Sequence, residues 1–246
     1  MFNMKKMEEM YKKEMYKDVL LNTDEIKIWE QLDNGCFIGT MTYSKDNVLF
    51  LKELLTSFEE QYGEEINLED AAKELKLYTD EGKLFIYFDK NMKPISMNGC
   101  VYNHHNSSFD FESDKELNSL YIYGLSTLKD YRGKGACSAL VEFAMEFAKY
   151  NGFDLVYART DLVGSKSEKI LEANGMEICK TDNKTIVEWV DVTETKGDYR
   201  KYLWLGLKDN ISIKPTNYSL LLPEGVLSCE VNKYGSKVYK KLSNKF

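Results

Sequence analysis

Hydrophobic and polar residues along the chain follow two spacings, one typical of helices and one typical of strands. Apolar residues recur at helical spacing from Met4 to about Leu21, on an otherwise charged segment, and again from about Asp46 to Tyr62. Asn67 can cap a further helix, LEDAAKELKLY, because its side chain accepts hydrogen bonds from the free amides of a first turn. A strand candidate, CFIGTMTY, precedes the second helix. We therefore expect a helical arm, a strand and two helices, in that order.

Strand patterns dominate the chain after these helices. KLFIYFD and ISMNGCVYN are strand candidates joined by the turn KNMKP, as in a hairpin. The run SLYIYGLSTL leads into a helical pattern, ALVEFAMEFAKY, and then into the strand candidate DLVYART, which is the order of a βαβ unit with a parallel pair. A third helix candidate, SKSEKILEANG, ends at Gly175, and MEICKT, TIVEWV and RKYLWLGL read as closing antiparallel strands. The pattern predicts an α/β fold.

Composition narrows the class of protein. A chain of 246 residues with 43% apolar residues favours one domain with extensions over two domains. It has no run of about 18 apolar residues and no signal-peptide core, so we expect a cytoplasmic protein that does not enter a membrane. The net charge of -7 argues against a nucleic-acid partner and weakly favours a cationic one. Five scattered cysteines without a CxxC pair indicate neither a disulfide framework nor a metal site.

The segment YRGKGACS, Tyr131 to Ser138, lies where the strand pattern passes into the long helix. A helix start carries unpaired N–H groups and a partial positive charge, so it attracts phosphate. Gly133 and Gly135 let the backbone approach an anion without a Cβ, while Arg132 and Lys134 add positive charge. A pyrophosphate fits this loop better than an amine does. GKGA lacks the Ser or Thr of a nucleotide triphosphatase loop, and GKGACS, as a degraded GxGxxG, leaves dinucleotide binding as the alternative.

The loop and its surroundings resemble the acetyl-CoA signature of the GNAT superfamily of N-acetyltransferases, in which a strand runs into Arg-x-x-Gly-x-Gly/Ala and a long helix. LSTLK stands for the end of that strand, with Lys129 in place of a proline, and RGKGAC stands for the loop, with Cys137 where Gly or Ala is usual. SEKILEANGM, Ser167 to Met176, is similar to the family's SxxIxExNGF-type segment. The resemblance covers about Cys36 to Lys208 and implies a mixed, mostly antiparallel central sheet flanked by helices.

This resemblance implies an enzyme that transfers the acetyl group of acetyl-CoA to an amine by direct attack in a ternary complex. The main-chain N–H groups of the loop would hold the pyrophosphate, and the edge of the preceding strand would pair with pantetheine and present an N–H to the thioester oxygen. Cys137 is then a small packing residue and not a nucleophile. The implied cofactor-binding residues are Leu125, Ser126, Thr127, Arg132, Gly133, Lys134, Gly135, Ala136, Cys137 and Ser138.

Two positions depart from the family's catalytic pattern. Leu171 stands where a tyrosine often protonates the leaving thiolate, and Gly164 where an asparagine is often found. No carboxylate lies near the start of the signature strand, where Tyr121 and Tyr123 stand instead. The acceptor ammonium, with a pKa of about 10.4, still needs a route for its proton. Tyr123 is the candidate catalytic residue, and these departures keep a second class open, a protein that binds CoA or acyl-CoA without turnover.

Other polar groups have simpler explanations. His104 and His105 are adjacent at a strand end, so they point to opposite faces and cannot form a metal clamp. The acidic run from Asp110 to Glu116 is expected to be a solvated loop. We expect a helical arm in residues 1–33, the acetyltransferase domain in 34–208 and an appendage in 209–246. The acceptor is a small-molecule or a peptide amine, and a homodimer is left open.

Overall fold

The computed structural model describes residues 20–59, 66–106, 108–162, 165–193, 196–216, 220–223, 230–231 and 237–238. The chain divides into two compact units, which are described separately here. Unit 1 comprises Met1–His104, Asn118–Tyr157 and Gly206–Lys208, and unit 2 comprises His105–Leu117, Ala158–Leu205 and Asp209–Phe246. The predicted arm helix, Met4 to about Leu21, lies outside the described residues except for its last two positions, and the predicted domain limits stay a prediction.

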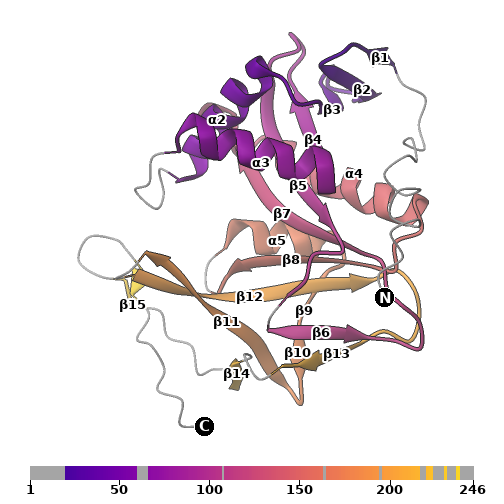
Figure 1. Ribbon diagram of the computed structural model, residues 1–246, viewed down its shortest axis with the longest axis vertical. Coiled ribbons are helices and arrows are strands. Elements are labelled where there is room, and N and C mark those ends of the chain that lie inside the picture. Colours follow the sequence, from indigo (N-terminus) through magenta and orange to yellow (C-terminus); the bar gives the residue numbers. More distant parts are fainter. Residues whose placement is uncertain are drawn as a thin grey trace. The chain divides into compact units, whose positions relative to one another are not determined.

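Unit 1 is built on an antiparallel sheet (Figure 1). Its strands follow the order β1-β2-β3-β4-β5-β7, each antiparallel to its neighbour. β8 (Leu155–Asp161) comes next in the order, beginning in unit 1 and ending in unit 2. The bounds are β1 Leu21–Asn22, β2 Ile26–Gln31, β3 Phe37–Met41, β4 Gly82–Phe88, β5 Pro94–Tyr102 and β7 Ser119–Thr127.

Helices cover both faces of this sheet. α2 (Lys45–Glu59) and α3 (Leu68–Glu81) contact each other and the central strands, and α4 (Ala136–Tyr150) packs on β4, β5 and β7. The Ser126 hydroxyl donates to the Leu54 carbonyl of α2 at 2.8 Å. The next residue pair along these two strands is Asn98 on β5 and Leu125 on β7. The side-chain amide of Asn98 donates to the Leu140 carbonyl of α4 at 3.2 Å. Because successive strand residues face opposite sides, α2 and α4 lie on opposite faces.

Unit 2 contains one described helix, α5 (Lys166–Ala173), and antiparallel strands, of which β11 and β12 are the longest. β11 pairs with β10, β12 and β14, β12 also pairs with β9, and β13 pairs with β6. Leu162, Val187, Tyr199 and Leu222 form a buried cluster in this unit. The bounds are β6 Phe109–Glu112, β9 Glu177–Ile178, β10 Lys180–Thr181, β11 Lys184–Thr193, β12 Lys196–Gly206, β13 Ser212–Pro215, β14 Leu220–Pro223, β15 Glu230–Val231 and β16 Lys237–Val238.

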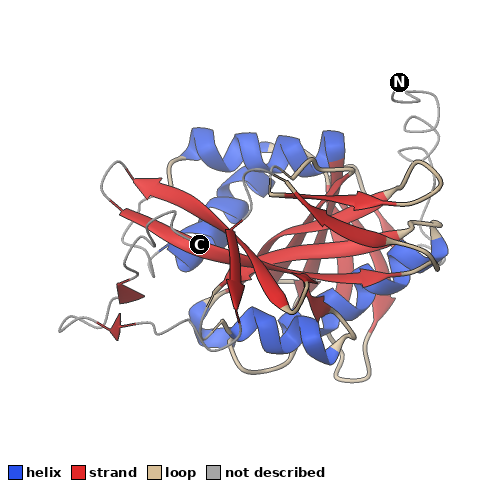
Figure 2. Cartoon of the chain, turned by 90° about the horizontal axis from the view of Figure 1, so that it is seen from below, coloured by secondary structure: helices blue, strands red, loops and turns tan. Residues whose placement is uncertain are grey.

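The mixed, mostly antiparallel sheet flanked by helices confirms the predicted α/β fold class (Figure 2). Asn67 caps α3 as expected, with its side-chain oxygen accepting from the Asp70 N–H at 3.0 Å. The prediction of a solvated acidic loop from Asp110 to Glu116 is wrong in part. Residues 109–112 form β6, which pairs with β13, and Glu112 makes a salt bridge with Lys214 at 2.9 Å. The pattern also missed β2, which pairs with β3.

Candidate functional site

A glycine-rich loop joins the end of β7 to the start of α4. After Thr127 the chain makes one 3-10 turn, η1 (Lys129–Tyr131), and α4 begins at Ala136. Gly133 and Gly135 have left-handed backbones, with φ angles of 75° and 84°. Residues that carry a Cβ rarely adopt this region. Glycine is therefore needed at both positions to turn the chain from the strand into the helix.

The amino end of α4 is open. Gly135 is the N-cap residue, and no side chain caps it. The Ala139 N–H donates to the Gly135 carbonyl at 3.0 Å, so the N–H groups of the three residues before it have no acceptor within the helix. A Cβ placed on Gly133 or Gly135 would meet no atom within 4 Å, so the space in front of the loop is free of described side chains. The helix start can therefore accept an anion.

The two basic side chains of the loop are exposed and tied to its own backbone. Nε of Arg132 donates to the Thr127 carbonyl at 3.0 Å, and Nζ of Lys134 donates to the Asp130 carbonyl at 2.9 Å. Nζ of Lys134 also lies 5.2 Å from the centre of the Tyr131 ring, a cation–π contact. These contacts hold two positive charges beside the open helix start.

The last residues of β7 lead directly into the loop. Ser126 and Thr127 use their side chains within the fold, since the Ser126 hydroxyl bonds Leu54 and the Thr127 hydroxyl lies 2.7 Å from the Ser96 hydroxyl. Leu125 is half-buried opposite Asn98. One edge of β7 pairs with β5, and β8 is its neighbour on the other side in the strand order. These side chains position the strand, so any contact with a ligand falls to the main chain.

A β-bulge interrupts the pairing of β5 with β7. Gly99 pairs with Gly124 and Cys100 with Ile122, which leaves Tyr123 as the extra residue. A Cβ on Gly99 would lie 2.2 Å from Cζ of Tyr78, and one on Gly124 would lie 2.8 Å from its hydroxyl oxygen. The two facing glycines thus make room for the Tyr78 ring of α3. Sequence reasoning missed Tyr78, although a glycine inside a strand is a signal of close approach.

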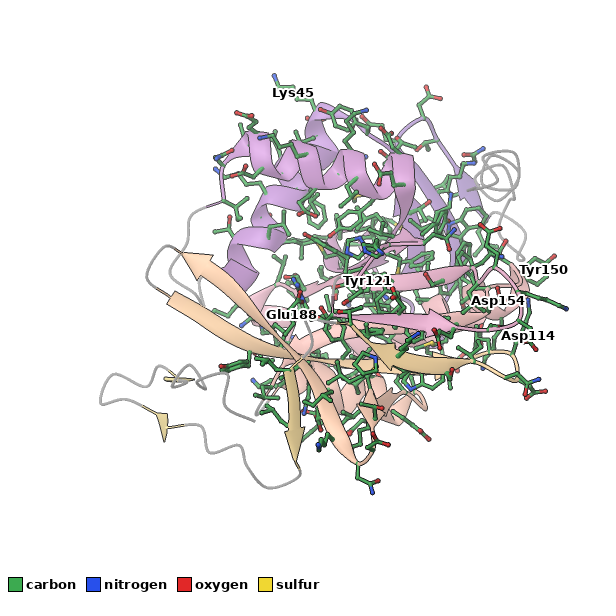
Figure 3. The ribbon with its side chains drawn as sticks, turned by 60° about the horizontal axis from the view of Figure 1, so that its bottom comes forward. Lys45, Asp114, Tyr121, Tyr150, Asp154 and Glu188 are labelled. Atoms are coloured by element: carbon green, nitrogen blue, oxygen red, sulfur yellow. The ribbon has the colours of Figure 1, made fainter. Side chains whose placement is uncertain are left out.

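Aromatic side chains gather around this bulge. The Tyr123 ring is 42% exposed and lies edge-on to the rings of Tyr78 and Tyr121, at 6.1 and 5.8 Å between centroids. Tyr121, labelled in Figure 3, stacks between the rings of His104 and Tyr157 at 4.7 and 4.6 Å. His104 therefore belongs to an aromatic stack. Tyr123, the predicted catalytic residue, is more exposed to solvent than Tyr121, the other member of the cluster on β7.

A pocket of about 500 Å³ lies beside η1, the turn that precedes the two glycines. It is formed by one face of α2, the turn between β4 and β5, and η1. Its lining combines three lysines with two carboxylates and the Tyr131 ring: Leu49, Lys52, Glu53, Thr56, Lys93, Leu128, Lys129, Asp130 and Tyr131.

The remaining predicted positions are placed as follows. Cys137 is half-buried in the first turn of α4, and burial raises the pKa of its thiol to about 11, so the thiol is protonated at neutral pH. Leu171 is buried in α5 of unit 2, and Gly164 lies outside the described residues. Among the described residues no three His, Cys, Asp or Glu side chains gather to hold a metal ion. None of the described helices has the length and apolar character needed to cross a bilayer.

Comparison with protein families gives one match. The model of the acetyltransferase (GNAT) family matches residues 49–176, a span that runs from α2 to the end of α5 and contains the loop and the bulge. No curated protein matches the chain in sequence.

Solved structures share the fold at low identity. The NatC complex bound to Gag peptide and CoA contains a chain that is 18% identical, with a TM-score of 0.52, over 70% of this chain and 99% of that one. An N-acetyltransferase from Staphylococcus aureus Mu50 is 13% identical, with a TM-score of 0.51, over 70% and 97%. A GNAT-family acetyltransferase from Bacillus anthracis is 11% identical, with a TM-score of 0.50, over 69% and 95%. These likenesses show the fold.

Proposed function

The chain belongs to the acetyltransferase (GNAT) family, and from this membership we propose that it transfers the acetyl group of acetyl-CoA to a small-molecule or peptide amine. The observation that carries the proposal is the open start of α4, reached through two left-handed glycines that follow β7 and η1. An exposed, uncapped helix start beside two cations suits a pyrophosphate.

The residues of the loop fit CoA, which supplies the acetyl thioester. The N–H groups from Gly133 to Ser138 hold the pyrophosphate, with Arg132 and Lys134 adding positive charge at its edge. The main-chain N–H of Arg132 already donates to the Lys129 carbonyl at 3.3 Å, so its contribution comes mainly from charge. Ala136 and Cys137 are small enough to keep the first turn narrow.

The strand before the loop, β7, binds the thioester end of acetyl-CoA. The main chain of Leu125, Ser126 and Thr127 pairs with pantetheine, since the side chains of Ser126 and Thr127 are engaged in the fold. An N–H at the bulge beside Tyr123 then faces the thioester oxygen. Such a donor stabilises the negative charge that develops there as the amine attacks, and loss of a donor of this kind typically costs about 10²- to 10³-fold in rate.

The acetyl group passes directly to the acceptor nitrogen. A covalent route through Cys137 is disfavoured, because its thiol has a raised pKa of about 11 and the thiolate is the reactive form. In the direct route a nitrogen–carbon bond forms, the carbon–sulfur bond breaks, and the nitrogen loses a proton.

Thiol release from acetyl-CoA across a panel of amines tests the proposal, with CoA binding measured separately by calorimetry. Acceptor-dependent thiol release together with an acetylated product supports acetyl transfer. CoA binding without release for any amine would instead establish the alternative, a protein that binds CoA without turnover.

A further inference from the structure

The pocket beside η1 has no part in the acetyl transfer proposed above. Its volume of about 500 Å³ lies within unit 1, between one face of α2, the turn from β4 to β5, and η1. Pockets for small organic ligands usually have volumes of about 300 to 1,000 Å³. Because α2 and α4 cover opposite faces of the sheet, the pocket lies on the α2 side, whereas the open helix start belongs to α4.

Hydrogen bonds to the main chain fix two walls of this pocket. In the turn from β4 to β5, the side chain of Asp89 accepts from the N–H groups of Asn91 and Lys93 at 2.8 and 2.9 Å. The Leu128 N–H donates to the Ile95 carbonyl at 3.0 Å, which ties the start of η1 to β5. The turn and η1 are therefore held in place before any ligand binds.

Three lysines from three elements line the pocket: Lys52 of α2, Lys93 of the turn and Lys129 of η1. No carboxylate of the described residues forms a salt bridge with any of them, although Glu53 and Asp130 belong to the same lining. Lys52 is half-buried, so its ammonium has lost part of its water without gaining a partner among these residues. An anionic ligand would supply that partner.

Apolar and aromatic groups form another part of the lining. Leu128 is 7% exposed, and Leu49 and the half-buried Tyr131 ring stand beside it. Nζ of Lys93 and Nζ of Lys134 lie 5.5 and 5.2 Å from the centre of the Tyr131 ring, as cation–π contacts. A carbon skeleton gains by covering such a surface, and a bare inorganic ion does not. The ligand that fits is therefore organic as well as anionic.

We propose that this pocket binds a small organic phosphate, as a second ligand besides CoA. A phosphate monoester carries between one and two negative charges near neutral pH and three strong acceptor oxygens. It can therefore engage several ammonium groups at once, which a single carboxylate does less well. Leu128 and Tyr131 pack against the carbon skeleton, and Glu53 and Asp130 accept hydrogen bonds from its hydroxyl groups.

Calorimetric titration of the full chain with AMP and with glucose 6-phosphate tests the proposal, in the absence and in the presence of saturating CoA. Adenosine and glucose, which lack the phosphate, are the control ligands. We expect at least one of the two phosphates to bind under both conditions and neither control to bind. Lys52→Gln and Lys93→Gln should each raise its Kd about tenfold, because each removes a charged donor to the phosphate.

A matched variant separates this pocket from the general charge of the surface. Lys45→Gln removes an exposed lysine at the start of α2, outside the pocket lining (Figure 3), and should leave the Kd unchanged. CoA affinity should be the same in Lys52→Gln and wild type, since Lys52 lies on the α2 side of the sheet.

Three results would overturn the proposal. They are binding of neither phosphate, a wild-type Kd in both Lys52→Gln and Lys93→Gln, and displacement of the bound phosphate by CoA, which would make the pocket part of the CoA site. The titration without CoA requires no acetyl transfer. Its outcome is therefore independent of the proposed function, which fails separately if no amine is acetylated.

Discussion

At the scale of single residues, the absent side chain of Gly135 decides both the path of the backbone and the access of an anion. Its φ of 84° strains any other residue, and it is the uncapped N-cap of α4, at the proposed pyrophosphate site. Gly152, just beyond the other end of α4, has a φ of 74° and equally open surroundings. Both glycines have a backbone conformation that would strain any other residue, but only Gly135 lies in the loop before α4.

Gly135→Val should therefore abolish CoA binding. Gly152→Val should lower the free energy of unfolding by a similar amount and leave CoA binding intact. The β-branched side chain would crowd the N–H groups that are proposed to hold the pyrophosphate. Calorimetric titration with CoA measures the first effect and urea unfolding the second. Equal CoA affinity in the two folded variants would refute the role of the loop.

Glu74 of α3 is half-buried, one of its carboxylate oxygens makes no hydrogen bond in the described part of the chain, and this gives a second prediction, on stability. Since its pKa is raised in the folded state, the native protein binds more protons than the unfolded chain in the interval between the ordinary and the raised pKa. Stability contributed by the protonated carboxyl is therefore present at low pH and lost as the pH rises through the folded-state pKa.

Glu74→Gln should melt at a higher temperature than wild type above that interval, with the difference shrinking as the pH falls to about 4, near the ordinary pKa of a glutamate. For a chain of this size each kcal/mol corresponds to about 2 to 4 °C. Thermal melts at several pH values measure the difference. A gap that widens toward low pH would contradict the buried, partly unpaired state of the carboxyl.

At the scale of elements, the start of α3 depends on one side chain. The Asn67 side chain satisfies the Asp70 N–H at 3.0 Å. Asn67→Ala should lower the free energy of unfolding by about 1 kcal/mol, and Asn67→Asp, which keeps the acceptor oxygen, should not. Urea unfolding measures both. Equal stability of the two variants would show that the cap contributes nothing.

Elements with strong periodicity were predictable, and those defined by distant partners were not. The spacing of apolar residues predicts α3 and α4, and the capping residue Asn67 indicates where α3 begins. β6 was missed because Asp110 and Glu112 read as a solvated run, while its stability comes from pairing with β13, about a hundred residues away. Whether such a segment forms a strand depends on its partner strand and not on its local sequence pattern.

The candidate site divides in the same way. Arg132, Gly133 and Gly135 were visible because the proposed phosphate-binding loop is contiguous in sequence and its glycines have a local cause. The position of Tyr78 was not, because only the packing of α3 against the paired glycines of β5 and β7 brings its ring to the bulge. A contact assembled across elements has no spacing to recognise.

At the scale of the whole molecule, the net charge of -7 is the feature that bears on the acceptor. An acidic protein attracts a cationic substrate over distances longer than a contact, and salt screens this attraction beyond about 8 Å at physiological ionic strength. The cations of the loop before α4, Arg132 and Lys134, are proposed to act on the other ligand, CoA. The two substrates should therefore respond differently to salt.

We predict that kcat/KM for an acceptor with two or more positive charges falls severalfold as salt is raised from about 0.02 to about 0.5 M, whereas a zwitterionic acceptor changes little, since the field acts on net charge. Asp110→Asn with Glu112→Gln changes the net charge from -7 to -5 and should flatten the salt dependence. Because Glu112 is paired with the exposed Lys214, most of the change is expected from Asp110. CoA affinity, measured in parallel, serves as the control and should be the same in the double variant and wild type. Identical salt slopes for the two acceptors would mean that the acidic surface serves solubility alone and takes no part in choosing the amine.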